Sequence, residues 1–218
     1  MSRDPGPRSA GLLLAAGGGS RFGGAKALAS FRGEPLVRRV VRLLHDGGCA
    51  PVVVVLGAQA DEVAAVLEGE PTIGCVRSVV AADWRTGMGA SLRTGIEAVS
   101  GEPVDAVVIA LVDQPLVGAE AIRRLRAAHA AGATAAVATY ADQPRNPVLL
   151  DRAVWPEVAA AAGQDVGARS WLRAHPQQVV SVPCDGTGIP DDADVPADLR
   201  RLEQHHTPDS RRRAGPKG

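Results

Sequence analysis

The segment GLLLAAGGGSRFGGAK, residues 11–26, begins as a short apolar run and continues into a loop with five glycines among the eight residues 17–24. The apolar start, residues 11–15, predicts a β-strand. The glycines let backbone amides approach an anion closely, and Arg21 and Lys26 add positive charge. The segment therefore predicts a strand that leads into a binding loop for a polyphosphate, although a flexible strand-to-helix loop is an alternative.

The glycine spacing does not match either of the two common phosphate-binding loops. The dinucleotide spacing Gly-x-Gly-x-x-Gly, started at Gly17, would need glycine at the position of Phe22. The Walker spacing, with its last glycine at Gly24, would need lysine and then serine or threonine at the positions of Ala25 and Lys26. A dehydrogenase of the usual dinucleotide-binding type is therefore disfavoured.

Short β-rich runs alternate with amphipathic helical patterns along the chain, which predicts an α/β domain with a mostly parallel sheet and crossover helices. The predicted strands are residues 11–15, 51–56, 75–80, 106–112, 134–139, 147–150 and 179–182, and the predicted helices are residues 36–44, 59–67, 90–99, 120–131, 153–161 and 166–174. No repeat or interior linker divides the chain, so residues 11–202 form one predicted domain, with flexible tails at 1–10 and 203–218.

Composition and charge exclude several classes of protein. The chain has 218 residues, 45% apolar and 22% charged, as in soluble globular proteins. Its apolar runs fall short of the ~20 residues of a membrane-spanning helix, and no signal-peptide pattern is present, so we expect a cytoplasmic protein without membrane contact. Basic and acidic residues number 24 each, but the basic excess lies in the predicted tails, so we expect no nucleic-acid partner. The three cysteines have no spacing typical of disulfides or zinc sites.

Lysine is almost absent from the chain. Arginine supplies all but two of the 24 basic residues, and the two lysines are Lys26 and Lys217. Lys26 is therefore the single lysine of the predicted domain. A compact ammonium fits between phosphate oxygens where a planar guanidinium is too bulky, so we interpret Lys26 as a functional phosphate ligand. A chance survivor on the surface is the alternative interpretation.

An acid, Asp113, follows the predicted strand 106–112. The unbroken apolar run of this strand is typical of a strand that is covered on both faces. Strands 11–15 and 106–112 are expected to flank the switch point of the sheet, where ligands bind outside the carboxyl ends, so Asp113 should lie near the glycine loop. A carboxylate beside a triphosphate needs a hard cation between them, which predicts Mg²⁺. A role in the turn or as an N-cap is the alternative for Asp113.

Two further segments carry candidate ligands. Residues 83–92 lead from a strand to a helix and place glycines at the helix N-terminus, where amides can bind phosphate, ribose or base. A plain helix start explains that loop equally well. Five aspartates crowd into residues 185–198. Such a cluster is usually a solvated loop, and the alternative is that Asp192 or Asp194 is a second metal ligand.

Several of these segments resemble the nucleotidyltransferases that activate sugars, lipids and the molybdenum cofactor. The start of the chain resembles the family signature at Leu14-Ala15-Ala16-Gly17, Arg21-Phe22-Gly23 and Lys26. Later segments resemble the cytidylyltransferase branch of the molybdenum-cofactor (MobA-like) family, at Trp84 and at residues 87–93, 113–117, 165–169 and 192–199. The resemblance extends over residues 11–202 and implies a single Rossmann-like, three-layer α/β/α domain that uses an NTP and Mg²⁺.

The resemblance also implies a reaction and a set of site residues. A phosphate of the acceptor, molybdopterin or the molybdenum cofactor, attacks the α-phosphorus of the NTP, expected to be CTP, and pyrophosphate leaves. The implied catalytic residues are Lys26, Arg21 and Asp113, and the implied metal ligands are Asp113 and Asp194. The implied nucleotide contacts are Leu14, Ala15, Ala16, Gly17, Gly18, Gly19, Ser20, Arg21, Lys26, Gly87, Met88, Gly89, Ser91 and Asp113. Transient contact with a molybdoenzyme maturation partner is a further implication.

The chain departs from the family pattern at three places. Arg145-Asn146-Pro147 replaces the usual Gly-His-Pro on the acceptor side. Ala90 replaces a serine near the nucleotide. Val195 replaces a threonine at the start of the last helix, which makes Asp194 a candidate substitute N-cap. Two alternatives therefore stay open: a transferase for another phosphorylated acceptor, and a non-catalytic nucleotide-binding module.

Overall fold

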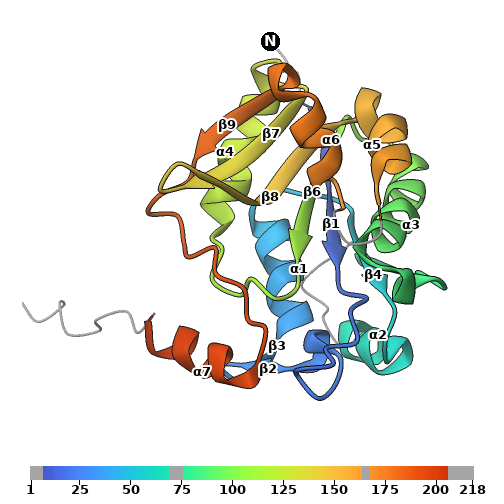
Figure 1. The fold of residues 1–218 in the computed structure, drawn as a ribbon, viewed down its shortest axis with the longest axis vertical. Helices are drawn as coiled ribbons and strands as arrows, with labels where there is room; N and C mark the ends of the chain where they lie inside the picture. Colours follow the sequence, from blue (N-terminus) through green and yellow to red (C-terminus); the bar gives the residue numbers. More distant parts are fainter. Residues whose placement is uncertain (1–6, 69–75, 164–166, 206–218) are drawn as a thin grey trace, which may run out of the picture.

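The computed structural model describes residues 7–68, 76–163 and 167–205 and folds them around one large sheet (Figure 1). The sheet has seven strands in the order β5-β4-β1-β6-β8-β7-β9. The strands are β1 (Ser9–Leu14), β4 (Val52–Leu56), β5 (Val76–Val80), β6 (Ala106–Leu111), β7 (Ala135–Tyr140), β8 (Gln143–Asp151) and β9 (Val179–Pro183). A separate hairpin pairs β2 (Ser30–Phe31) with β3 (Glu34–Pro35).

The sheet is parallel except for one strand. β1 pairs in parallel with β4 on one side and β6 on the other, and Leu14 lies opposite Leu111 at the carboxyl ends of β1 and β6. β8 runs antiparallel between β6 and β7, and β9 is again parallel to β7. The predicted α/β class, the mostly parallel sheet and the pairing of the strands before the glycine loop and before Asp113 are therefore confirmed.

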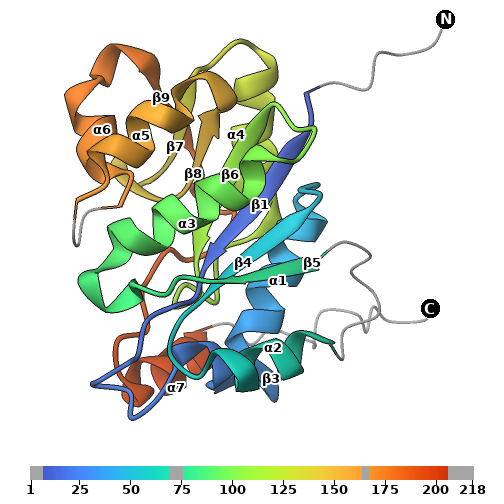
Figure 2. The same ribbon diagram turned by 90° about the vertical axis from the view of Figure 1, so that its right-hand side faces the viewer.

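Helices cover both faces of the sheet. The α-helices are α1 (Leu36–Asp46), α2 (Ala60–Glu68), α3 (Met88–Ser100), α4 (Ala119–Ala130), α5 (Trp155–Ala161), α6 (Arg169–Ala174) and α7 (Pro196–His205). Four 3-10 turns are η1 (Lys26–Leu28), η2 (Trp84–Thr86), η3 (Arg152–Val154) and η4 (Pro176–Gln178). One core contains the inward side chains of α1, α2, α4 and α7, and the other contains those of α3, α5 and α6. Figure 2 shows this second group together on one side of the sheet.

Alternation along β1 explains why this strand is central. Leu13 belongs to the core under α1, whereas Leu12 and Leu14 belong to the core under α3. Helix α3 approaches the sheet closely at Gly95, where an added Cβ would lie 2.6 Å from a methyl carbon of Leu12. A one-residue slip of β1 would move every side chain to the opposite core, where it would not fit the packing, so the carboxyl end of β1 is held in place.

The element boundaries differ from the predictions at several points. β1 begins at Ser9, within the predicted tail, and α7 continues to His205, beyond the predicted domain end at residue 202. β8 is longer than the predicted strand 147–150 and antiparallel, because it returns from β7 through a tight turn. The β2–β3 hairpin was not predicted, since two-residue strands carry no periodicity. The rest of the predicted tails, residues 1–6 and 206–218, lies outside the described residues.

None of the helices in the described ranges has both the length and the apolar character that a membrane span requires.

Candidate functional site

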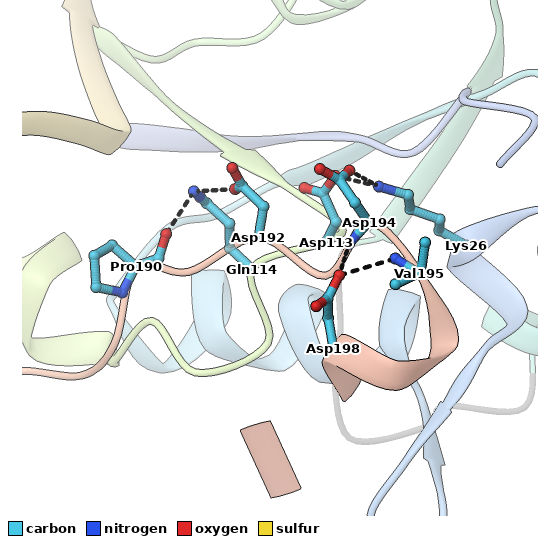
Figure 3. Close-up of polar contacts among 8 residues, drawn as sticks. All are labelled: Lys26, Asp113, Gln114, Pro190, Asp192, Asp194, Val195 and Asp198. Carbon is cyan, nitrogen blue, oxygen red and sulfur yellow. Dashed lines mark hydrogen bonds and ion pairs between the residues drawn. The ribbon is translucent and has the colours of Figure 1, made fainter. Parts of the chain in front are cut away.

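Three segments that are far apart in the sequence meet beyond the carboxyl ends of β1 and β6. Lys26 opens η1, Asp113 follows β6 after one residue, and Asp194 lies in the segment before α7. The Lys26 Nζ donates to Asp113 Oδ2 at 2.9 Å and to Asp194 Oδ1 at 2.8 Å (Figure 3). The structure therefore brings together the predicted phosphate ligand and the two predicted metal ligands, with the ammonium between the two carboxylates.

The charges in this cluster stabilise one another. Burial alone would lower the pKa of Lys26, but hydrogen bonds to and the charges of Asp194 and Asp113 outweigh burial and raise it. The hydrogen bond from Lys26 and its charge lower the pKa of Asp194, and the charge of Arg21 acts in the same direction. Lys26 therefore stays an ammonium and Asp194 a carboxylate at neutral pH.

Asp113 retains coordinating capacity that the protein does not use. Its Oδ1 is buried and has no hydrogen-bond partner, although its Oδ2 accepts from Lys26. A buried oxygen without a partner is unusual, because leaving such a group unpaired costs free energy. Carboxylate oxygens are the ligands that Mg²⁺ prefers, and Mg²⁺ is commonly bound by one or two carboxylates together with substrate phosphates. Asp113 and Asp194 therefore fit the predicted metal.

The described residues contain no group of three or more His, Cys, Asp or Glu side chains arranged to hold a metal. The protein thus offers a divalent ion two carboxylates at this point, and further ligands would have to come from water or from a bound phosphate.

The segment that carries Asp194 is fastened to the turn after β6. Ala193 N–H donates to the carbonyl oxygen of Asp113 at 2.8 Å. The Nε2 of Gln114 donates to Asp192 Oδ1 at 2.8 Å and to the carbonyl oxygen of Pro190 at 3.1 Å (Figure 3). These hydrogen bonds fix the position of the segment relative to Asp113. Asp194 is therefore positioned without the help of Lys26.

The two candidate aspartates have different surroundings. Asp194 contacts Lys26, whereas the Asp192 carboxylate accepts from Gln114. Burial raises the pKa of Asp192, and the nearby charge of Asp113 raises it further. The structure thus pairs Asp194, rather than Asp192, with Asp113 around one cation.

The start of α7 corrects the suggestion that Asp194 replaces a missing N-cap. The Oδ2 of Asp198 accepts from the backbone N–H groups of Asp194 and Val195, each at 3.0 Å. An acid in the first turn that reaches back to the residue before the helix satisfies amides that the helix leaves unpaired. Because Asp198 takes this role, the Asp194 side chain is available to Lys26.

The glycine loop presents free amides. Within the described residues, the N–H groups of residues 17–21 donate to no protein acceptor. Gly19 has a φ of +54°, and a Cβ there would lie 2.1 Å from the carbonyl oxygen of Gly24, so the loop requires glycine at this position. Gly17, Ser20 and Arg21 are exposed, as a binding loop for a polyphosphate requires.

The residues that precede this loop are buried, unlike the exposed residues of the loop itself. The side chains of Leu14, Ala15 and Ala16 are buried in the two cores, so the nucleotide contacts predicted for Ala15 and Ala16 would be made by their backbone groups. Gln59, which the sequence did not single out, supports the far end of the loop, because its Oε1 accepts from Ala25 N–H at 2.8 Å. No sequence signal distinguishes this glutamine, which comes near the loop only because β1 and β4 are paired.

The second predicted loop opens α3. Gly87 precedes the helix with a φ of +122°, a conformation that favours glycine, and Met88 is 40% exposed at the helix N-terminus. Gly89 is needed for packing, since a Cβ there would lie 1.9 Å from the carbonyl oxygen of Gly163. Ala90 and Ser91 are buried, so the missing hydroxyl at Ala90 belongs to the interior of the fold rather than to an exposed surface.

A cleft of about 470 Å³ lies beside this loop, over the β6-β8-β7-β9 half of the sheet. Leu14 and Met88 line one end of it, and its floor is apolar. Three arginines line its walls, namely Arg145 on β8 and Arg169 and Arg173 on α6. No acidic side chain lines the cleft within the described residues, and the charge of Arg145 reaches Asp192. The cleft is therefore suited to an anionic ligand with an apolar body.

Comparison with known proteins matches the chain to one family and to two proteins along nearly its whole length. The family described as "MobA-like NTP transferase domain" matches residues 11–180. The chain is 37% identical to nicotine blue oxidoreductase of Paenarthrobacter nicotinovorans, over 90% of this chain and 97% of that protein. It is 30% identical to molybdenum cofactor guanylyltransferase of Rhodobacter capsulatus, over 90% of this chain and 95% of that protein.

Solved structures give the same fold. Rv0371c from Mycobacterium tuberculosis H37Rv superposes with a TM-score of 0.75 at 27% identity, over 91% of this chain and 99% of that chain. A manganese complex of the same mycobacterial protein matches with a TM-score of 0.70 at 26% identity, over 90% of this chain and 98% of that chain.

Proposed function

This chain belongs to the MobA-like NTP transferase family, and on that premise we propose that it transfers CMP from CTP to the phosphate of molybdopterin or of the molybdenum cofactor, with release of pyrophosphate. The observation that carries the proposal is the meeting of Lys26, Asp113 and Asp194 beside a loop of free amides. Nucleotidyl transfer needs mainly positioning and charge neutralisation from a protein, and these groups supply both.

In the proposed reaction a phosphate oxygen of the acceptor attacks the α-phosphorus in line, and the bond to pyrophosphate breaks. The amides of residues 17–21 hold the triphosphate, and Arg21 and Lys26 neutralise the charge that builds up on it. Asp113 and Asp194 are the residues that would hold Mg²⁺, which when bound supplies positive charge between the carboxylates and the phosphates. Gly87 and Met88, of which Met88 is 40% exposed, are the residues that would contact the nucleoside.

The cleft is proposed as the acceptor site. Its apolar floor and its arginines suit a ring system that carries a phosphate better than a sugar phosphate, which needs many polar partners. Among the three arginines of the cleft, Arg145 is the one whose charge acts on the aspartate cluster, through Asp192. A guanidinium can grip a phosphate with two parallel hydrogen bonds, so Arg145 would orient the attacking group. Delivery of the product to a molybdoenzyme maturation partner stays a prediction.

The identity of the preferred nucleotide is tested by calorimetric titration of Mg-CTP, Mg-GTP and Mg-ATP into the protein. Pyrophosphate release with molybdopterin as acceptor is then measured. GTP is the main competitor, since the relative from Rhodobacter capsulatus is a guanylyltransferase. We expect CTP to bind most tightly, because a pyrimidine pocket rejects purines by size and a wrong base leaves buried groups unpaired. Tighter binding of GTP or ATP would overturn the base assignment. Binding of CTP without turnover on any phosphorylated acceptor would favour a non-catalytic nucleotide-binding module.

A second candidate function is favoured by one observation. The 37% identity to nicotine blue oxidoreductase extends over nearly the whole of both chains, so a redox reaction on an aromatic compound is the alternative use of the cleft. Incubation with nicotine blue and NADH or NADPH separates the two functions. Loss of the dye's absorbance without any NTP would support the oxidoreductase. Pyrophosphate release without dye reduction would support the transferase.

A further inference from the structure

The position of Lys26 is not the position that the proposed transfer requires. A lysine that neutralises a triphosphate must point to the phosphates, yet in this structure both hydrogen bonds of its ammonium go to the carboxylates of Asp113 and Asp194. The Lys26 side chain is 16% exposed, so the ammonium lies inside the cluster rather than in solvent. Lys26 thus occupies the space between the two oxygen ligands that a divalent ion would use.

The protein offers a divalent ion little else at this point. The Oδ1 of Asp113 is buried without a partner, and the described residues contain no group of three or more acidic, histidine or cysteine side chains in a metal-binding arrangement. Two carboxylates shared with an ammonium are a poor site for an ion that holds its water tightly and is usually completed by substrate phosphates. A triphosphate in the glycine loop would supply those phosphates and would also offer the ammonium a stronger anionic partner.

We propose that Lys26 is the internal cation of the Asp113–Asp194 pair in the nucleotide-free protein, and that a divalent metal takes this place only when a bound triphosphate draws the ammonium away. This inference rests on the proposed function for the identity of the anion. It makes the binding of metal and nucleotide cooperative. The triphosphate draws the ammonium away from the metal ligands, and the metal neutralises the carboxylates that would repel the triphosphate. It also keeps two nearby carboxylates paired before substrate arrives.

The contacts that hold Asp113 and Asp194 in position do not depend on Lys26. Asp113 and the segment before α7 are joined through Ala193 N–H, Gln114 and Asp198, and none of these contacts involves the lysine. Removal of the ammonium therefore leaves two carboxylates near each other and near the charge of Asp192. Like charges in such proximity favour the uptake of any available cation.

The test is the binding of Mn²⁺ to nucleotide-free protein, followed through the electron paramagnetic resonance signal of the free ion. We expect Lys26→Met to bind Mn²⁺ at least tenfold more tightly than the wild-type protein does. Lys217→Met, which removes the other lysine of the chain, should bind as the wild-type protein does. Adding Asp113→Asn to Lys26→Met should abolish the gain, which assigns the ion to this pair.

Equal or weaker Mn²⁺ binding by Lys26→Met would overturn the inference, as would tight binding by the nucleotide-free wild-type protein. Circular dichroism checks the fold, and Lys26→Gln provides the same measurement if the methionine variant does not fold. The readout needs neither nucleotide nor acceptor. A failure of nucleotidyl transfer therefore leaves this result interpretable, and a failure of the metal experiment leaves the transfer assay unaffected.

Discussion

The two halves of the candidate site compensate their charges in opposite ways. At the ends of β1 and β6, the Lys26 ammonium forms ion pairs with the carboxylates of Asp113 and Asp194, at 2.9 and 2.8 Å. In the neighbouring cleft, Arg145, Arg169 and Arg173 have no hydrogen-bond or ion-pair partner among the described residues. The paired carboxylates and ammonium suit a site that exchanges one cation for another. The unpaired arginines of the cleft suit a site that binds an anionic ligand. The difference predicts that substitutions in the first half abolish the chemistry, and that substitutions in the second half change the affinity for one substrate.

The largest effect is expected at Asp113. Asp113→Asn removes the charge of the carboxylate with the buried, unpartnered oxygen, so pyrophosphate release with CTP and molybdopterin should fall below detection. The fold should be retained, because the side chain lies at a strand end and contributes little to the core. Circular dichroism and the pyrophosphate assay check both points. Near-normal Mg²⁺-dependent activity in this variant would remove Asp113 from the metal site.

Lys26→Ala should be the next most damaging change. Loss of one donor aimed at transition-state charge costs roughly 10²–10³ in rate, and single-turnover kinetics with saturating CTP measure it. Lys26→Arg should also be slow, since a planar fork cannot replace a compact ammonium in a crowded phosphate site. A fully active arginine variant would show that the single lysine of the domain is a chance survivor.

Arg145→Ala tests the cleft. A hydrogen bond to a charged group contributes about 1.5–3 kcal/mol, so the KM for the phosphorylated acceptor should rise roughly 10- to 100-fold while calorimetric CTP affinity stays unchanged. Arg200→Ala, at an exposed position on α7, is the matched control. A loss of CTP affinity in the Arg145 variant would place this arginine with the nucleotide and blur the contrast between the two halves.

The smallest effect is expected at Asp198, which supports the first half from a distance. Asp198→Ala should lower the free energy of unfolding by about 1 kcal/mol, because two amides at the start of α7 lose their acceptor. Urea unfolding measures this change, with the exposed Asp191→Ala as the control. Activity should fall only a few fold, since Ala193 and Gln114 still anchor the segment. A complete loss of activity would mean that Asp198 alone positions Asp194.

Much of the architecture was predictable because local patterns carry it. The apolar runs at residues 52–56 and 106–110 are buried, and such runs are typical of strands that are covered on both faces. Asp113 could be expected near the glycine loop for the same reason, since paired parallel strands end at the same edge. The antiparallel β8 was harder to predict, because strand direction depends on the connection from β7 and not on side-chain alternation.

The sequence by itself determined the α/β class and the neighbouring strands before the glycine loop and before Asp113, and it singled out Lys26 as the one lysine of the predicted domain. Only the tertiary structure decided that Asp194 rather than Asp192 meets Lys26, that Asp198 caps α7, and that Gln59 and Gln114 support the site. The physical reason is the distance along the chain over which each kind of information acts. Periodicity and glycine content act within one element, whereas Lys26 and Asp194 are 168 positions apart and meet only after the sheet, its crossovers and the last helix have packed.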